Sequence, residues 1–186
     1  MIVNESGLLQ AMKDSYKLGG YHIAVGEVFD KKCYLITSGS YRWAVVIRHS
    51  KMPRKILGLL AEHIGRLPED GEAFLCKKDN EAQSEMLDVT IKPILQKLVA
   101  AGETYLGMKR TRLTWDGENV WQDAELEVAL IPPSLEKIIV FKDTSPRMVE
   151  RCLYVEGQLS YVYIHRTVPG EAEKNIVAQL GRAVWY

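Results

Sequence analysis

Apolar side chains recur along the chain with two spacings, and the switch between them outlines the predicted elements. From residue 4 to 18 they recur every three or four positions, which predicts an amphipathic helix that ends at Gly19 and Gly20. Short β-rich runs with brief polar connectors follow at 21–29, 33–37 and 41–48. Runs so close in sequence predict an antiparallel meander.

A second helix and strand are predicted next. Pro53 suits the first position of a helix, and the apolar stripe behind it predicts a helix over 54–67 and then a strand over 72–78. The acidic stretch 79–88 is interpreted as a surface connector. Because Pro93 disfavours one unbroken helix, the third helix is expected to begin at residue 90 or 92 and to end at 101.

The strongest turn signal is Asp116-Gly117, which lies between two β-rich runs and predicts a central hairpin over 103–131. A two-residue loop places Arg110 opposite Asp123, whereas a four-residue loop places Arg112 there. The two registers differ by two residues, so both place the same side chains on the same faces. One face is apolar, and the other carries Trp121 among charged side chains, which predicts a solvated face with cross-strand ion pairs.

The last third of the chain gives less uniform signals. A strand is predicted over 137–142, and the stretch 148–155 fits either a helix or a strand. Large apolar side chains on both faces of 158–166 predict a central strand. A last helix is predicted over 171–180, before the apolar end at Trp185 and Tyr186, which is expected to pack on the core or on another subunit.

These elements predict an α+β protein with a mostly antiparallel sheet and four or five helices, either as one domain over 1–186 or as two lobes, 1–80 and 81–186, that share a core. The order of helix, meander and proline in the first half recurs in the second. An internal duplication would explain this, although chance recurrence is the simpler explanation. The order helix, three strands, helix, strand is similar to that of small chaperone-like α+β proteins of bacteria, a likeness of fold that implies no function.

Charge is balanced overall but not locally. The chain has 24 Lys and Arg against 24 Asp and Glu, whereas a dedicated nucleic-acid-binding protein carries an excess of positive charge. The segment 42–66 is basic and the segment 69–88 is acidic. Such blocks pair within one molecule or across a symmetric interface, and they favour a homo-oligomer.

Cysteine use and hydropathy indicate the compartment. Cys33, Cys76 and Cys152 lie far apart without metal-ligand spacing, which is typical of reduced structural thiols in a cytosolic protein. Charged residues interrupt the apolar positions of the first 17 residues, and no apolar run is long enough to span a bilayer. We therefore expect a soluble, cytoplasmic protein without membrane contact.

The sharpest candidate site is a basic loop where a strand is followed by a helix N-terminus. Helix N-termini bind anions through free N–H groups, and nearby cations strengthen that binding. The candidate anion-binding residues are Arg48, His49, Lys51, Arg54 and Lys55. The alternative is a solvated loop with mobile side chains.

Other chemistry has weaker support. No phosphate-binding glycine loop, metal-ligand spacing or nucleophile motif is present, so no metal, cofactor or catalytic residue is assigned. Arg110 and Arg112 beside Trp121 could stack on bases, but the acidic residues on the same face would repel phosphate. Tyr161, Tyr163 and His165 share one strand face and could line a small-molecule enzyme pocket.

The preferred function is therefore a non-enzymatic protein-binding or assembly protein that acts as a homo-oligomer. Trp121, Trp185 and Tyr186 are its candidate interface residues. The first alternative is a phosphate- or nucleic-acid-binding protein that uses the loop 48–55. The second alternative is a small-molecule enzyme.

Overall fold

The structure is a computed structural model, and it describes residues 1–103, 106–125, 127–158 and 160–167. The protein has mixed helices and antiparallel sheets, as an α+β protein should. Its described part contains four α-helices, and the predicted helix 171–180 lies outside the described residues. The helices are α1 (Glu5–Lys17), α2 (Arg54–Ile64), α3 (Leu87–Glu103) and α4 (Pro133–Glu136), with a 3₁₀ turn, η1 (His49–Lys51), before α2.

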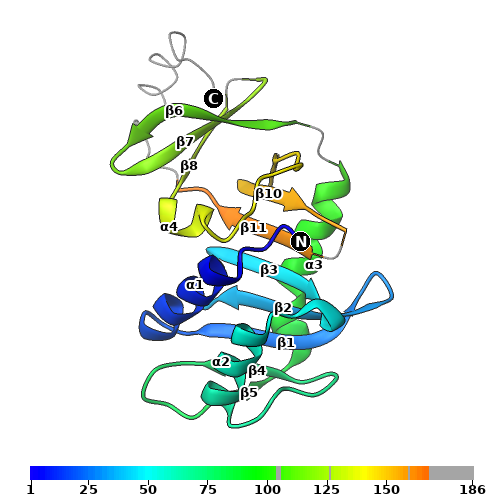
Figure 1. Cartoon of the computed structure of the whole chain (residues 1–186). Helices are drawn as coiled ribbons and strands as arrows, with labels where there is room; N and C mark the ends of the chain where they lie inside the picture. Colours follow the sequence, from blue (N-terminus) through cyan, green and yellow to red (C-terminus); the bar gives the residue numbers. More distant parts are fainter. Residues whose placement is uncertain (104–105, 126, 159, 168–186) are drawn as a thin grey trace.

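The strands form two antiparallel sheets (Figure 1). The larger has eight strands, in the spatial order β5 (Gln83–Glu85), β4 (Ala73–Cys76), β1 (Tyr21–Val28), β2 (Lys31–Ser38), β3 (Trp43–Arg48), β11 (Ser160–His165), β10 (Cys152–Glu156) and β9 (Arg147–Val149). The smaller is the meander β6 (Met108–Trp115), β7 (Glu118–Asp123) and β8 (Val128–Ile131). The prediction of a central strand over 158–166 is confirmed, because β11 pairs with β3 on one side and β10 on the other.

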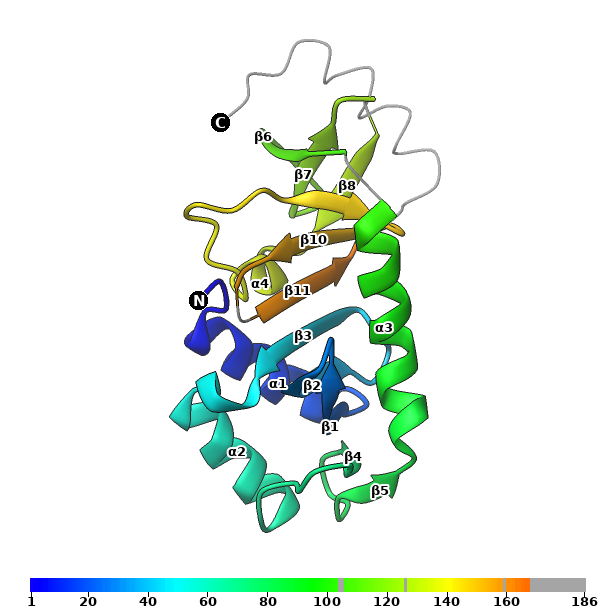
Figure 2. The same ribbon diagram turned by 90° about the vertical axis from the view of Figure 1, so that its right-hand side faces the viewer.

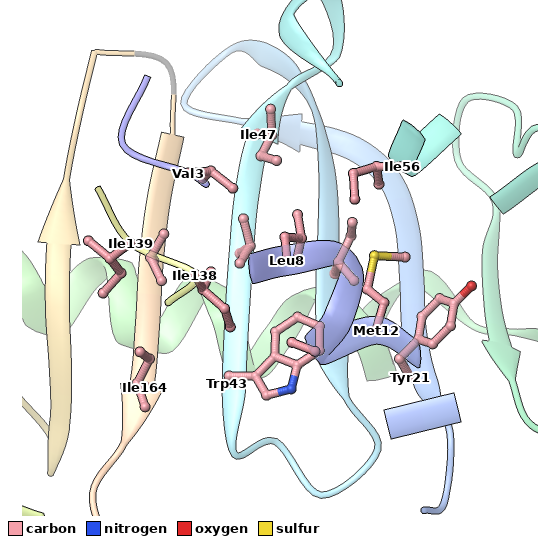
Figure 3. Packing of buried hydrophobic residues seen from close by; sticks show 14 of the residues in the cluster. Val3, Leu8, Met12, Tyr21, Trp43, Ile47, Ile56, Ile138, Ile139 and Ile164 are labelled. Atoms are coloured by element: carbon pink, nitrogen blue, oxygen red, sulfur yellow. The ribbon is translucent and has the colours of Figure 1, made fainter. Parts of the chain in front are cut away.

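Helices cover both faces of the large sheet, with α1 and α2 on one side and α3 on the other (Figure 2). Side chains that alternate along each strand therefore enter two separate cores. Figure 3 shows the first core, where Leu8 and Met12 of α1 point at Trp43 and its neighbours on the sheet. Burial on both faces explains why these strands are apolar almost throughout.

The start of the chain is fixed by contacts with its second half. Asn4 accepts a hydrogen bond from the Gly7 N–H at 3.1 Å, which caps α1. The Asn4 N–H donates to the Ile138 carbonyl at 2.8 Å, and Val3 forms a β-bridge with Ile139. The residues that follow α4 therefore pack directly on the N-terminus of α1, and the predicted strand over 137–142 is reduced to this single bridge.

The pairing order of the strands repeats between the two halves. In the first half the spatial order is β5, β4, β1, β2, β3. In the second, β6 to β8 form a meander, Gly107 beside β6 bridges Arg147 of β9, and β9 pairs with β10, which gives the order β10, β9, β6, β7, β8. Each half also starts with a helix and has a helix after its meander. The two halves thus share their element order, whereas the step from β9 to β6 consists of one isolated bridge between two separate sheets.

Two boundary predictions near α3 were wrong. The presumed connector 79–88 contains β5 and the start of α3, and α3 continues through Pro93. Proline removes the N–H that would have bonded the Val89 carbonyl four residues earlier. In the fold, the Tyr41 hydroxyl donates to that carbonyl at 3.4 Å. This replacement comes from a distant turn, so local pattern could not reveal it.

The central hairpin has the predicted two-residue turn but not the predicted register. Trp115 pairs with Glu118, and a bulge between Arg110 and Thr114 then places Arg110 opposite Trp121 instead of Asp123. The buried Thr111 hydroxyl stabilises the bulge by donating to the Val120 carbonyl at 2.9 Å.

The predicted solvated face of this hairpin is wrong for Trp121 and Asp123, whereas Arg112, Glu125 and Glu127 are exposed as predicted. Trp121 is only 4% exposed and belongs to the first core, where its ring lies 5.2 Å from that of Phe141. Asp123 on the same face is buried as well. Part of the face is therefore covered by other elements of the fold. The ambiguous stretch 148–155 forms the end of β9 and β10 around a turn at Glu150 and Arg151.

We expect Gly7→Ala to lower the free energy of unfolding by about 1–3 kcal/mol, despite the helix preference of alanine, because its Cβ would overlap the Lys137 carbonyl. Gly58→Ala in α2 is the matched control, since nothing lies within 4 Å of its Cβ position. That change should raise stability by about 0.5–1 kcal/mol. Urea unfolding of both variants checks this, and equal effects would contradict the close packing of α1.

Candidate functional site

The basic loop is divided between the two faces of the large sheet. Arg48 ends β3 on the α3 side, where its charge opposes the burial that raises the pKa of the Cys33 thiol. His49 begins η1 and stacks on Tyr34 in the opposite core, with ring centroids 4.9 Å apart. Arg48 and His49, two of the five predicted anion-binding residues, therefore lie on opposite faces of the sheet.

The N-terminus of α2 already has an anionic partner from the same chain. The Lys55 N–H, in the first turn of α2, donates to Glu5 Oε1 at 3.1 Å. A carboxylate in this position is stabilised by the helix dipole and offsets the neighbouring cations. Among the described residues, no carboxylate lies within ion-pairing distance of the side chains of Lys51, Arg54 or Lys55. Glu5 therefore occupies part of the predicted anion site.

We expect Glu5→Ala to destabilise the protein by about 0.5–1 kcal/mol by removing this carboxylate from the helix N-terminus. Phosphate should restore more stability to the variant than it adds to the wild-type protein, because it can take the vacated N–H groups. Thermal unfolding in phosphate and in chloride buffers of equal ionic strength measures the difference. An equal response of both proteins would count against anion binding here.

A second cluster, absent from the sequence predictions, lies at the end of the sheet where β3 meets β11. The Phe29 ring, at the tip of the β1–β2 hairpin, lies 6.5 Å from the Tyr161 ring in an edge-to-face arrangement. Burial raises the pKa of Tyr161, and the charge of Glu156 raises it further, whereas the charge of Arg48 opposes this shift. We call Phe29, Tyr161 and Arg48 the aromatic–arginine patch. Figure 1 shows the β1–β2 hairpin of this patch extending beyond the sheet on the right.

Phe29 is both exposed and conformationally strained. It is 61% exposed, and it forms with Asp30 a two-residue turn in which both φ angles are positive, at 48° and 60°. Such turns favour Asn, Asp and Gly, as at Asp116-Gly117, because a larger side chain in the left-handed region costs about 1–2 kcal/mol. The turn at Glu150 and Arg151 shares this strain. Phe29 differs because it also presents an aromatic ring to solvent.

The surroundings of the aromatic–arginine patch carry both signs of charge. Asp30 and Glu27 are exposed on the same hairpin as Phe29, and Lys31 is exposed beside them. Arg48 acts on Tyr161 and has no carboxylate within 4 Å among the described residues, and the exposed Glu156 is paired with Tyr161 across β10 and β11. An apolar centre with a mixed charged rim is typical of protein interfaces. Exposed carboxylates beside the ring are unfavourable for a nucleic-acid phosphate.

The residues proposed for a small-molecule enzyme are Tyr161, Tyr163 and His165 on β11. Tyr163 is fully buried, with the Lys97 ammonium 5.9 Å from its ring centre and the Tyr154 ring at 5.0 Å. Burial raises the pKa of its hydroxyl far above the ordinary value. His165 lies with Nδ1 2.9 Å from the Arg166 carbonyl. Four cavities of about 440–810 Å³, lined by described residues, involve neither these residues nor Tyr161.

One histidine is tied into an aromatic cluster between α1, α2 and β1. His63 Nδ1 lies 2.7 Å from the Tyr21 hydroxyl, and the Tyr16 ring stacks on the imidazole at 3.8 Å. Burial raises the pKa of Tyr21, so its hydroxyl remains protonated beside the imidazole. Burial, aided by Lys13, lowers the pKa of His63, against a smaller opposite effect of Glu62.

This cluster predicts a pH dependence of stability. Below a pH of about 6.5 the unfolded chain protonates His63 more readily than the folded protein does, so stability falls as the pH drops towards the lowered pKa. His63→Gln should flatten the dependence of the free energy of unfolding between about pH 7 and pH 5.5. Urea unfolding at these two pH values checks it, and an unchanged slope in the variant would assign the effect to another group.

Within the described ranges, no group of three or more His, Cys, Asp or Glu side chains could hold a metal ion, and no helix is long and apolar enough to cross a membrane. The three cysteines are buried and free. Trp121, a predicted interface residue, is a core residue, and Trp185 and Tyr186 lie outside the described residues.

No family model matches the sequence, and no curated protein or solved structure matches it either. Sequence reasoning missed the aromatic–arginine patch because it placed Phe29 at the end of a strand. The available signal was an aromatic residue beside Asp30 in a connector between two equally long strands.

Proposed function

We propose that the chain is a non-enzymatic assembly protein that pairs with a second copy of itself through the aromatic–arginine patch. The observation that supports this function is Phe29, an aromatic side chain that is 61% exposed and held in a left-handed backbone conformation. Both its exposure and its backbone cost free energy in the isolated chain. An interface that buries the ring would offset that cost, and aromatic and arginine side chains dominate binding energy at interfaces.

A second copy is the partner that fits the charges best. In a two-fold symmetric contact the same patch serves both subunits, so it must be complementary to itself. The acidic Asp30 lies next to Phe29, whereas Arg48 and the exposed Glu156 both lie next to Tyr161. A two-fold axis through the aromatic centre would place Asp30 of each copy towards Arg48 of the other. The aromatic rings would then be enclosed by paired charges.

The basic and acidic blocks give this proposal less support than the patch does. Several of their members pair within the chain. Arg66 donates to both carboxylate oxygens of Glu72, with distances of 2.7 and 2.6 Å, and Lys32 pairs with Asp70. Glu85 is 2.7 Å from His22. Trp185 and Tyr186 stay predicted interface residues, to be tested separately from the patch.

The variant Phe29→Asn tests the proposal, because asparagine suits the turn but removes the ring. We expect the wild-type protein to be a dimer or higher oligomer in native mass spectrometry, and the variant to dissociate with a constant at least about tenfold larger. In dilute solution, where both proteins are monomeric, the variant should unfold at higher urea, with a gain of about 1 kcal/mol.

Glu150→Asn is the matched control. Glu150 has a φ of 45° in the first position of the other strained two-residue turn, so asparagine relieves similar strain there without touching the patch. This variant should gain stability and keep the wild-type assembly mass. A monomeric wild-type protein, or a Phe29→Asn variant that assembles as tightly as wild type, would overturn the proposal.

A second candidate function is binding of phosphate or nucleic acid by the loop 48–55. Its support is that Lys51, Arg54 and Arg48 lack carboxylate partners in the described part of the chain. Two observations are unfavourable for this candidate function. Glu5 already accepts from the N-terminus of α2, and the loop is divided between two faces of the sheet. Binding of a single-stranded oligonucleotide that weakens steeply with salt would favour this candidate over assembly.

A further inference from the structure

A cavity of about 440 Å³ lies far from the aromatic–arginine patch, at the opposite end of the strands. It is formed where the C-terminal end of α1, the turn between β2 and β3, and α4 come together, on the left in Figure 1. Its volume is within the range of small-molecule sites, about 300–1,000 Å³. Glycines allow the turn between β2 and β3 to approach the end of α1 closely. The Gly39 N–H donates to the Gly20 carbonyl at 2.8 Å, and a Cβ on Gly39 would press on Gly19 and Gly20.

The wall of the cavity is apolar, with a few polar groups that have hydrogens left to donate. Leu18, Pro132 and Leu135 supply apolar surface, and Trp43 borders the cavity but is itself only 2% exposed. Ser15 Oγ accepts the indole N–H of Trp43 at 3.2 Å, and Ser38 Oγ accepts the Arg42 N–H at 2.8 Å. Because both oxygens act as acceptors in these bonds, their hydroxyl hydrogens remain available to a ligand.

Two cations and one carboxylate complete the cavity lining. The Lys17 side chain is exposed at the rim. Arg42 donates to Thr167 and lies 3.9 Å from Glu118, which uses only part of its five N–H donors. Asp14, the carboxylate of the lining, accepts from the Gln10 side chain at 2.9 Å. The cavity thus offers several hydrogen-bond donors, while Asp14 in the lining and Glu118 beside Arg42 offset the charges of Lys17 and Arg42.

We propose that this cavity binds a small amphipathic organic anion, with its apolar body against Pro132 and Leu135 and its anionic group at Arg42. An anion is favoured because the available hydroxyl hydrogens and the guanidinium all donate, and charge-assisted hydrogen bonds are the strongest of their kind. An apolar body is favoured because Leu18, Pro132 and Leu135 line the wall. This site is independent of self-assembly through Phe29.

Two fluorescent probes test the proposal. Anilinonaphthalene sulfonate is an aromatic anion, and phenylnaphthylamine has the same ring system without the sulfonate. We expect the sulfonate to bind at one site, about tenfold or more tighter than the neutral probe, because only the sulfonate can accept from Arg42. Arg42→Gln should weaken sulfonate binding about tenfold and leave the neutral probe unchanged. Equal affinity of the wild-type protein for both probes would overturn the proposal.

The location is tested by filling the cavity. Ser134 is exposed and lines the cavity, so Ser134→Trp should block both probes while circular dichroism confirms the fold. Ser134→Ala is its matched control and should bind like the wild type. Sulfonate binding that survives Ser134→Trp would place the probe elsewhere and refute the site. Phe29→Asn should bind the sulfonate normally, which separates a failure of this site from a failure of assembly.

Discussion

The pairing of β3 with β11 is the interaction on which the rest of this structure depends. β3 lies in the first half of the chain, and β11 is the last strand of its described part. Five residue pairs, from Trp43–Ile164 to Ile47–Ser160, join the two strands. This ladder converts two smaller groups of strands into one eight-stranded sheet. Val162, Tyr163 and Ile164 are fully buried there, and each large apolar side chain contributes about 1.5–3 kcal/mol. Because the contact is so distant in sequence, its loop entropy must be offset by many side chains at once.

The aromatic–arginine patch is a direct consequence of that pairing. Tyr161 is opposite Val46 in the ladder, and this places its ring near Arg48 and within reach of Phe29. Without β11 beside β3, the hairpin tip would have no aromatic partner. The strain at Phe29 is tolerated because eight paired positions between β1 and β2 hold the turn in place. The proposed interface and the continuity of the eight-stranded sheet therefore both depend on the pairing of β3 with β11.

The two proposed sites lie at opposite ends of the sheet strands, and both use turns whose backbone is unusual. Phe29 and Asp30 have positive φ angles at one end, and Gly39 touches the glycines after α1 at the other. The central strands are buried on both faces, so few of their side chains are exposed to bind a partner. Recognition is thus left to the loops, which a rigid sheet holds in place.

The sequence by itself determined the α+β class, most helices and strands, and the turn at Asp116-Gly117, because periodicity and turn chemistry act over a few residues. It also predicted β11 as a central strand from its two apolar faces. Only the tertiary structure decided that Tyr41 would satisfy Val89 and let α3 pass Pro93, that Trp121 would be buried, and that Glu5 would occupy the N-terminus of α2. Each of these depends on a partner far away in the chain, which no local pattern encodes. The patch and the cavity belong to this second group, since both form only where distant elements meet.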